Sequence, residues 1–417
     1  MLRGGASRQL RSSPVHSIPA EADVVVIGAG VSGASIGYQL ARHSDRRVVV
    51  VDARPPVGGI SGRTFGQIRQ HYSNELMVRM ALRGFHCIRS WASEVGYGDP
   101  GYVRLGYMLI VTENQVDGLR RNVELGRGLG VDTRFVGPDE IAAIEPLVNA
   151  EGLSGGAYEP DGGYIDVTKM VLSWLGAATA AGADVLTPLA VHEILVADGA
   201  VGGVATDRGE IRAPVVVAAT GAWAPDLLEP LGVHAPIERR RLDMATLEQE
   251  PGARALHTCI TDGNSNLVIR PDMGRRIVAV AYPPEMPPVD DPLADAPPAA
   301  VGDHAARLER ALAERLPALR SAGVVASTSG AYDITPDYHP ILGWASEIAD
   351  VAGLYLAVGL SGHGLKLSPC IGEIVASQVL GTAQVGSAPS IDAGALRPGR
   401  FDDGDLMHLT YGPSARA

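Results

Sequence analysis

The sequence contains few of the residues that build disulfide, metal or hydrolase sites. Its three cysteines, Cys87, Cys259 and Cys370, include no C-x-x-C pair, which argues against a disulfide framework or a zinc ribbon and favours a reducing compartment, so we expect a cytoplasmic protein. The eleven histidines show no H-x-H, H-x-x-H or H-E-x-x-H spacing, and we predict no metal site. A G-x-S-x-G elbow and a P-loop are also missing, which disfavours a serine hydrolase or a phosphotransferase.

Long apolar runs and excess positive charge are absent as well. The longest apolar stretches, near residues 24–27 and 215–219, are far shorter than the roughly 20 residues that span a bilayer, and residues 1–20 lack the apolar core of a signal peptide. The net charge is −12, with the acidic residues spread along the chain, which disfavours nucleic acid or anionic lipid as a partner. With 417 residues, of which 46% are hydrophobic, the chain is expected to form two globular domains.

Lysine is almost missing from this chain. Only Lys169 and Lys366 stand beside 33 arginines, so arginine is the ordinary surface cation here. A lysine that persists in such a sequence is expected where a compact ammonium, and not a planar guanidinium, is needed. Lys366 follows a glycine-rich turn and is the more informative of the two.

The apolar pattern predicts an α/β fold with two sheets. Four continuous apolar runs are typical of strands buried on both faces of a largely parallel sheet: residues 24–27, 48–51, 215–219 and 354–358. Segments with Gly or Asp turns predict antiparallel strands of a second, mixed sheet: residues 104–111, 205–212 and 267–282. Residues 283–300, rich in Pro, Ala and Asp, predict a surface loop.

A nucleotide-binding signature follows the first apolar run. Gly28, Gly30 and Gly33 form a G-x-G-x-x-G motif between an apolar strand and an apolar-periodic helix, and Asp52 follows the next apolar strand. Gly28 permits a tight turn, Gly30 lets the backbone approach a pyrophosphate, Gly33 allows the helix to pack on the strand, and Asp52 can bind ribose hydroxyls. The alternative is a plain glycine-rich turn, and the motif alone serves NAD as well as FAD.

The segments that follow favour FAD. The chain from Ala53 to Thr64 is a Gly- and Ser-rich loop suited to line an extended ligand, which NAD-binding folds rarely need. Two later strands also lead into glycine turns, at Thr220-Gly221 and at Gly359–Gly364. Ligands of open α/β sheets bind at the carboxyl ends of the strands, so the three turns are expected to converge on one sheet edge.

Together these motifs carry a family resemblance over about residues 22–380. The chain resembles the FAD-dependent amine and amino-acid oxidoreductases grouped with D-amino-acid oxidase, and among them it is most similar to sarcosine oxidases and the sarcosine oxidase β subunit. Besides the first glycine motif, the pieces that carry it are Ile68-Arg69-Gln-His-Tyr72, Ala219-Thr-Gly-Ala-Trp223, Thr335-Pro-Asp-Tyr-His-Pro-Ile-Leu-Gly343 and Ser361-Gly-His-Gly-Leu-Lys366.

The resemblance implies a Rossmann-like FAD-binding domain of the glutathione-reductase type and a mixed-sheet α+β substrate domain. We expect the FAD-binding domain to comprise residues 21–90, 151–235 and 321–383, and the substrate domain residues 91–150 and 236–320. Residues 1–20 are expected to be a flexible tail, and residues 384–417 a tail that lies on the surface or frays. The residues expected to bind FAD are Gly28, Gly30, Val31, Ser32, Gly33, Asp52, Ala53, Arg54, Ser61, Gly62, Arg63, Thr64, Val191, Thr220, Gly221, Trp223, Gly362, His363, Gly364, Leu365 and Lys366.

The resemblance also implies roles for four residues at the reacting end. Lys366 and the turn before it are expected to stabilise the reduced flavin, and Lys366 and Arg69 to bind a substrate carboxylate, with about 1.5 to 3 kcal/mol for each good charged hydrogen bond. Tyr332 takes the place of a tyrosine over the substrate, where glycine and D-amino-acid oxidases carry an arginine. The alternatives are a solvent-exposed Lys366 and a surface or salt-bridged Arg69. His363 is expected either to contact the flavin or to cap a helix.

Departures from the sarcosine-oxidase pattern change what is expected. Gly330 stands where monomeric enzymes attach flavin through a cysteine, and Ile165 where the β subunits carry a histidine for a second flavin, so we expect non-covalent FAD and no covalent FMN. The strand at 267–282 has no lysine of the kind with which these oxidases activate oxygen; its only cations are Arg270, Arg275 and Arg276. This favours a quinone, an electron carrier or a partner subunit as acceptor, unless an arginine substitutes.

The expected reaction is oxidation of the C–N bond of a small secondary or N-methyl amino acid, or a related amine, by hydride transfer to flavin N5, giving an imine. Two alternatives remain: a 2-hydroxy-acid or C–C oxidising enzyme of the same fold, and a flavin-bearing subunit of a hetero-oligomeric dehydrogenase. The expected partners are the small-molecule substrate and either oxygen or an electron carrier. A homo- or hetero-oligomer is left open.

Overall fold

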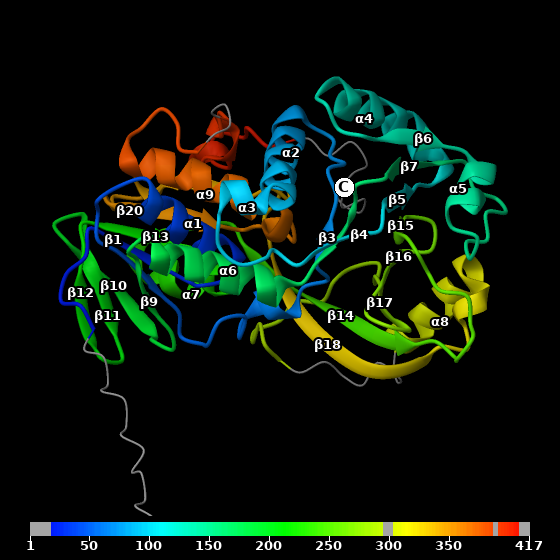
Figure 1. Ribbon diagram of the computed structural model, residues 1–417. Coiled ribbons are helices and arrows are strands. Elements are labelled where there is room, and N and C mark those ends of the chain that lie inside the picture. Colours follow the sequence, from blue (N-terminus) through cyan, green and yellow to red (C-terminus); the bar gives the residue numbers. More distant parts are fainter. Residues whose placement is uncertain (1–17, 295–302, 387–390, 408–417) are drawn as a thin grey trace, which may run out of the picture.

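The computed structural model of the protein describes residues 18–294, 303–386 and 391–407. The tails expected at residues 1–20 and 384–417, and the loop expected at 283–300, therefore fall partly outside the described residues. Two large sheets, one of six strands and one of eight, form the two halves of the molecule (Figure 1). The confirmed fold class is α/β, with mixed sheets.

The six-stranded sheet contains the nucleotide-binding motif. Its strands run parallel except for the antiparallel edge pair β19 and β20. The four apolar runs predicted as buried strands all belong to it, which confirms that prediction. In spatial order the strands are β19 (Ile341–Trp344), β20 (Leu354–Val358), β13 (Val215–Ala218), β1 (Val24–Ile27), β2 (Val48–Val51) and β9 (Asp184–Leu186).

The inner strands are apolar throughout because both faces of this sheet are covered. Val24 and Val26 of β1 belong to a core shared with the helices α1 (Val31–Arg42), α6 (Val167–Ala180) and α9 (Gly364–Leu380). Val25 and Ile27 belong to a second core, shared with a small antiparallel sheet on the other face. Successive side chains of a strand point to opposite faces, so burial on both sides requires an unbroken apolar run. The small sheet is β10 (Val191–Ala197), β11 (Ala200–Thr206) and β12 (Gly209–Arg212).

The eight-stranded sheet forms the other half of the molecule. All its pairs are antiparallel except β15 with β5. Its order is β18 (Gly323–Ile334), β14 (Glu238–Glu248), β17 (Arg276–Ala281), β16 (Leu267–Pro271), β15 (Cys259–Asp262), β5 (Tyr107–Ile110), β7 (Gly156–Glu159) and β6 (Arg134–Val136). The helices α4 (Val116–Gly128), α5 (Pro138–Ile144) and α8 (Asp303–Arg315) share its apolar cores.

Another small sheet and three more helices complete the named elements. In Figure 1 the strand β3 lies between the two large sheets. These elements are β3 (Gln67–Ile68), β8 (Gly163–Ile165) and β4 (Tyr102–Arg104), which form one small sheet, and the helices α2 (Glu75–Arg89), α3 (Trp91–Glu94) and α7 (Ala224–Leu228). No helix in the described part of the chain is long and apolar enough to cross a bilayer.

Two predicted strand assignments are corrected. Residues 205–212 form the end of β11 and β12 and do not join the second large sheet, because Val204 and Ile211 bury their side chains against the six-stranded sheet. The strand β18 pairs with β14 along its length, so the domain boundary expected at residue 321 precedes a strand of the eight-stranded sheet. The division into an FAD-binding and a substrate domain stays a prediction.

The last long helix directly follows the glycine turn that begins at Gly359. It is α9, which begins at Gly364 and therefore has Lys366 in its first turn. Pro369 lies inside this helix and cannot donate a backbone hydrogen bond. The carbonyl of Leu365, which that bond would have used, accepts instead from Ser368 Oγ at 2.9 Å.

The chain after α9 is packed where it is described. Residues 391–407 contain short 3-10 turns at Gly394–Leu396 and Pro398–Arg400. Arg400 is completely buried, and its Nε lies 2.8 Å from Asp337 Oδ2. This segment therefore lies at the surface, where Arg400 binds it to the rest of the molecule.

Candidate active site

The glycine motif forms a tight turn between β1 and α1. Gly28 has a left-handed φ of 106°, and its N–H donates to the carbonyl of Val51 on β2 at 2.7 Å. A side chain at Gly33 would overlap the Gly28 carbonyl, so glycine here lets the helix approach the strand. At Gly30 a Cβ atom would lie 2.8 Å from Ser61 Oγ and would fill the space in front of the helix.

Asp52 joins this turn to the loop that follows β2. Its Oδ2 accepts from the N–H of Ala29 at 2.8 Å, and its Oδ1 from the N–H of Arg54 at 2.9 Å. Beside it lies a cavity of about 430 Å³, where the Arg54 guanidinium lies 4.5 Å from the centre of the Trp223 ring. The predicted cofactor residues that line this cavity are Gly28, Gly30, Asp52, Ala53, Arg54, Ser61, Val191, Thr220, Gly221 and Trp223.

A narrower cavity of about 130 Å³ continues from the first towards the eight-stranded sheet. The two adjoin, because Gly30, Ser61 and Gly221 line both. Four predicted cofactor residues line neither: Gly33, which packs on Gly28; Gly62, where a side chain would overlap the Val57 carbonyl; and His363 and Lys366. Those that line the narrow cavity are Gly30, Val31, Ser32, Ser61, Arg63, Thr64, Gly221, Gly362, Gly364 and Leu365.

The polar groups along these two cavities fit a dinucleotide. Ser32 Oγ and Thr220 Oγ1 are buried and have no hydrogen-bond partner among the described residues. The helix α1 begins without a side-chain cap or an acidic residue, so its first turn presents N–H groups to an anion. An unpaired buried hydroxyl costs about 1 to 3 kcal/mol, which a polar ligand offsets. Ser32 and the α1 turn would suit a pyrophosphate and Asp52 a ribose, and these roles stay predictions.

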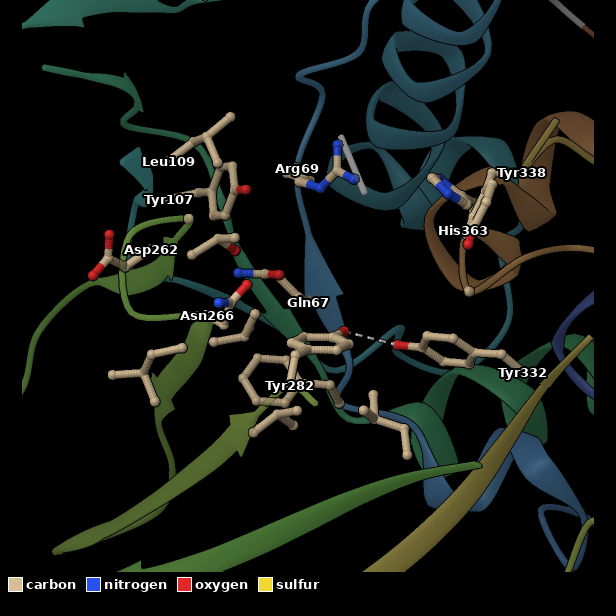
Figure 2. A pocket seen from close by; sticks show the side chains of 18 of the residues that line it. Gln67, Arg69, Tyr107, Leu109, Asp262, Asn266, Tyr282, Tyr332, Tyr338 and His363 are labelled. Carbon is tan, nitrogen blue, oxygen red and sulfur yellow. Dashed lines mark hydrogen bonds between the residues drawn. The ribbon is translucent and has the colours of Figure 1, made fainter. Parts of the chain in front are cut away.

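A third cavity, of about 460 Å³, lies between the two halves of the molecule (Figure 2). It adjoins the narrow cavity through residues that line both, among them Thr64 and Gly362. Its walls bring together all four residues predicted for the reacting end: Arg69, Tyr332, His363 and Lys366.

Lys366 and Arg69 are two buried cations in this cavity. Their exposed fractions are 8% and 7%, so neither is a solvent-exposed side chain. The Arg69 guanidinium lies 4.7 Å from the centre of the Tyr72 ring, and Lys366 Nζ lies 5.9 Å from the same centre; Arg69 Nη1 also donates to the His71 carbonyl. Burial, and then the charge of Arg69, lower the pKa of Lys366 well below its ordinary value. A carboxylate bound here would offset the cost of burying the Lys366 ammonium.

His363 faces the cavity and does not cap α9 through its side chain. Its Nδ1 lies 2.9 Å from the Tyr72 hydroxyl. Burial, together with the charges of Lys366 and Arg69, lowers the pKa of His363 well below its ordinary value, so the ring is neutral. His363 is nevertheless the N-cap residue of α9, and its contact with the flavin stays a prediction.

The opposite wall carries hydroxyl and amide groups. The Tyr332 and Tyr282 hydroxyls lie 3.3 Å apart (Figure 2). Gln67 Nε2 is buried, and no described residue accepts a hydrogen bond from it. Such groups can orient a small polar ligand in front of the two cations.

Sequence reasoning missed several residues of this wall. Tyr282 ends the predicted strand 267–282, but the sequence does not indicate which face of the sheet carries its side chain. Tyr338, which lines the cavity, and Tyr72, which contacts His363, stood inside quoted motifs but were given no role. Other unpredicted residues lie on short strands and turns without a motif: Gln67, Tyr107 and Asn266.

The expected departures can also be located. Gly330 lines the narrow cavity and offers no side chain for a covalent bond. Arg270 donates to the Phe65 carbonyl at 2.8 Å, lies over the Tyr164 ring at 4.3 Å and lines none of the three cavities. Arg275 and Arg276 do not line them either. The cavity linings therefore give no support to an arginine of this strand in the place of the oxygen-activating lysine, and the electron acceptor stays a prediction.

The fold and the site together define a class of protein, a dinucleotide-dependent oxidoreductase whose reacting end faces the cavity between the sheets. A family model described as "FAD dependent oxidoreductase" matches residues 23–378, and the chain belongs to this family. The cofactor is therefore FAD, which supplies a hydride acceptor when it is bound.

Three known proteins show what the chain is similar to. It is 26% identical to 4-methylaminobutanoate oxidase (formaldehyde-forming) of Paenarthrobacter nicotinovorans, over 92% of this chain and 46% of that protein. It is 26% identical to mitochondrial sarcosine dehydrogenase of Homo sapiens, over 90% and 42%. The crystal structure of glycine oxidase from Geobacillus kaustophilus matches with a TM-score of 0.77 and 26% identity, over 91% and 99%. The chain thus spans less than half the length of the first curated relatives that it matches.

Proposed function

We propose that the protein oxidises the C–N bond of a small secondary or N-methyl amino acid, or of a related amine. The carbon next to nitrogen gives up its hydrogen, with the bonding electron pair, to flavin N5. The nitrogen lone pair forms the new C=N bond, and water hydrolyses the resulting protonated imine. A substrate that binds as the neutral amine needs no protein base for the hydride step.

The observation that carries this proposal is the burial of Lys366 and Arg69 in one cavity. Two cations in a site shielded from water repel each other, and a carboxylate between them removes that repulsion. With the carboxylate fixed there, the α carbon is held at a set distance from it, which positions the C–H bond for transfer. The Tyr332 and Tyr282 hydroxyls line the same cavity and are proposed to contact the rest of the substrate.

Two relatives support the substrate class. The names 4-methylaminobutanoate oxidase and sarcosine dehydrogenase denote N-methylamines that also carry a carboxylate. The match to glycine oxidase favours a second candidate, a primary amino acid, for the same cavity.

We further propose that the electron acceptor is a carrier or a partner subunit and not oxygen. Support comes from the orientation of Arg270, which faces Phe65 and Tyr164 instead of the cavity, on a strand without lysine. Co-purification followed by a size measurement would detect a partner subunit.

The test is a flavin spectrum of the purified, FAD-loaded protein, followed by anaerobic mixing with N-methyl, cyclic, primary and D-amino acids. Bleaching of the flavin by N-methyl or cyclic amino acids is the expected result. Bleaching by 2-hydroxy acids and by none of the amines would refute the proposed substrate class. Admitting air then distinguishes the acceptors, because a dehydrogenase should regain its flavin colour slowly and an oxidase at once.

A further inference from the structure

The loop Thr335–His339 contributes a strained residue to the substrate cavity. Tyr338 lines that cavity with a φ of +59°, a left-handed conformation that bulky residues rarely adopt. Tyr338 and Tyr332 both pack against the same apolar cluster. Figure 2 shows Tyr338 and His363 on the same side of the cavity. Such strain persists only where the surrounding structure imposes it.

The same loop is tied to the turn in front of α9. The Thr335 N–H donates to Ser361 Oγ at 3.1 Å, and the Thr335 and Ser361 hydroxyls lie 3.2 Å apart. Ser361 also lines the cavity, and its φ of +49° is again left-handed. The loop therefore shares its geometry with the turn that leads to His363 and Lys366.

Arg400 forms hydrogen bonds with this loop without lining the cavity. Its Nε and Nη2 donate to the two carboxylate oxygens of Asp337 at 2.8 and 3.0 Å, and Nη2 donates to the His339 carbonyl at 2.9 Å. Its Nη1 donates to the carbonyls of Leu396 and Arg397 at 3.0 and 3.1 Å. Asp337 and His339 are the two neighbours of the strained tyrosine, so one guanidinium holds both.

The charge state of the pair agrees with this geometry. Burial raises the pKa of Asp337, but hydrogen bonds and charge from Arg400 outweigh that effect and lower the pKa below its ordinary value. Asp337 Oδ1 also accepts from the His339 N–H at 3.1 Å and from Thr335 Oγ1 at 3.2 Å. A bidentate arginine–carboxylate pair of this kind fixes direction as well as distance.

We propose that Arg400 is a positioning residue for the substrate cavity, which acts by holding Tyr338 and, through Thr335, the turn at Ser361. Arg400 itself lines none of the three cavities. The inference rests on the proposed function in one respect, namely that the third cavity binds the substrate.

The test measures ligand binding in the FAD-loaded protein. The probe is methoxyacetate, in which an ether oxygen replaces the sarcosine nitrogen so that no oxidation follows, and the readout is the change in flavin absorption on titration. We expect Arg400→Met to weaken methoxyacetate binding by about 10-fold or more, as for loss of a hydrogen bond to a charged group, while FAD content is retained. Added guanidinium ion should restore part of the lost affinity, and Arg400→Lys should lie between wild type and Arg400→Met.

A matched control separates positioning from stability. Arg83 forms another buried pair, with Glu373 at 3.0 Å from its Nε, and lines none of the three cavities. Arg83→Met should lower the melting temperature as Arg400→Met does, but should leave methoxyacetate affinity within about twofold. Equal losses of affinity in both variants would reduce Arg400 to a structural role and overturn the proposal.

A double-mutant cycle with Tyr338→Gly tests whether Arg400 affects ligand binding through Tyr338. Glycine tolerates the left-handed backbone, so this variant should fold even if Arg400→Met does not. We expect Tyr338→Gly to weaken methoxyacetate binding, and Arg400→Met to add little in that background. Wild-type affinity in Tyr338→Gly, or fully additive losses, would contradict the proposal. If the wild-type flavin responds to no carboxylate and no amine, the proposed function itself falls, and this inference falls with it.

Discussion

Replacing Lys366 by methionine removes the ammonium from the substrate cavity and keeps a side chain of similar length. The chain supplies its own control, because the only other lysine, Lys169, has a side chain that is 58% exposed and lies 3.8 Å from Asp99 on the surface. Lys169→Met makes the same chemical change where no ligand binds. Any difference between the two variants therefore reports on the cavity.

The expected magnitude follows from one charged hydrogen bond. Its loss costs about 1.5 to 3 kcal/mol, and each 1.4 kcal/mol is about tenfold in affinity. The dissociation constant of methoxyacetate should therefore rise about 10- to 150-fold in Lys366→Met and stay unchanged in Lys169→Met. The assay is titration of flavin absorption at constant ionic strength.

The pH dependence gives a second readout. The pKa of Lys366 is lowered by burial and by Arg69, and a bound carboxylate should raise it, so binding should take up a proton. Wild-type affinity should then fall as the pH rises above the lowered pKa of Lys366, and Lys366→Met should lose this dependence.

Without a ligand, the buried Lys366 ammonium should instead destabilise the folded protein. The folded-state pKa lies below the unfolded value of about 10.4, so between these two pKa values the unfolded chain binds more protons, and wild-type stability rises with pH. Lys366→Met should therefore melt at a higher temperature than wild type, and the difference should shrink as the pH approaches 10.4 or so. Unchanged methoxyacetate affinity in Lys366→Met, or equal losses in both variants, would refute the reasoning.

Three further results are expected. Gly30→Ala should weaken FAD retention, because its Cβ would lie 2.8 Å from Ser61 Oγ, between the two cavities expected to bind the dinucleotide. The control Gly128→Ala, whose Cβ would have no atom within 4 Å, should retain FAD. Equal FAD retention by the two variants on gel filtration would contradict this prediction. Burial raises the pKa of Glu159 to about 7, above its value of about 4.3 in the unfolded chain. The stability of the folded protein should therefore fall as the pH rises from about 4.3 to about 7. A melting temperature that depends just as steeply on pH in Glu159→Gln would refute this. Because Gly330 offers no nucleophile, acid precipitation should leave the FAD in the supernatant, and yellow protein in the pellet would show a covalent link.

The sequence predicted the parallel strands well because a strand that is buried on both faces needs an apolar residue at every position. In β1 and β2, which read VVVI and VVVV, every side chain is buried, and only an unbroken apolar run can satisfy both covered faces. The residues at the reacting end were found for a different reason. Lys366 and Arg69 stand in motifs that carry the family resemblance, and the structure brings both side chains to one cavity.

The missed features depend on contacts between segments without a motif. Arg400 is one of 33 arginines, and nothing in its surroundings distinguishes it until the chain folds it onto Asp337, 63 positions earlier. Tyr107 reaches the cavity because β5 pairs in parallel with β15, which connects segments about 150 residues apart along the chain. Strand pairing over such separations is set by packing and not by local pattern.

The six-stranded sheet has a consequence for synthesis of the protein. Its central strand β1 lies between β2 and β13, and β13 pairs with β20. The strand β20 and the helix α9 are translated more than 300 residues after β1. While the ribosome is still translating the middle of the message, the nascent polypeptide exposes the apolar faces that α9 will cover and lacks Lys366. Flavin capture should therefore be a late event of biogenesis, and chains released before residue 380 should require chaperones to stay out of aggregates.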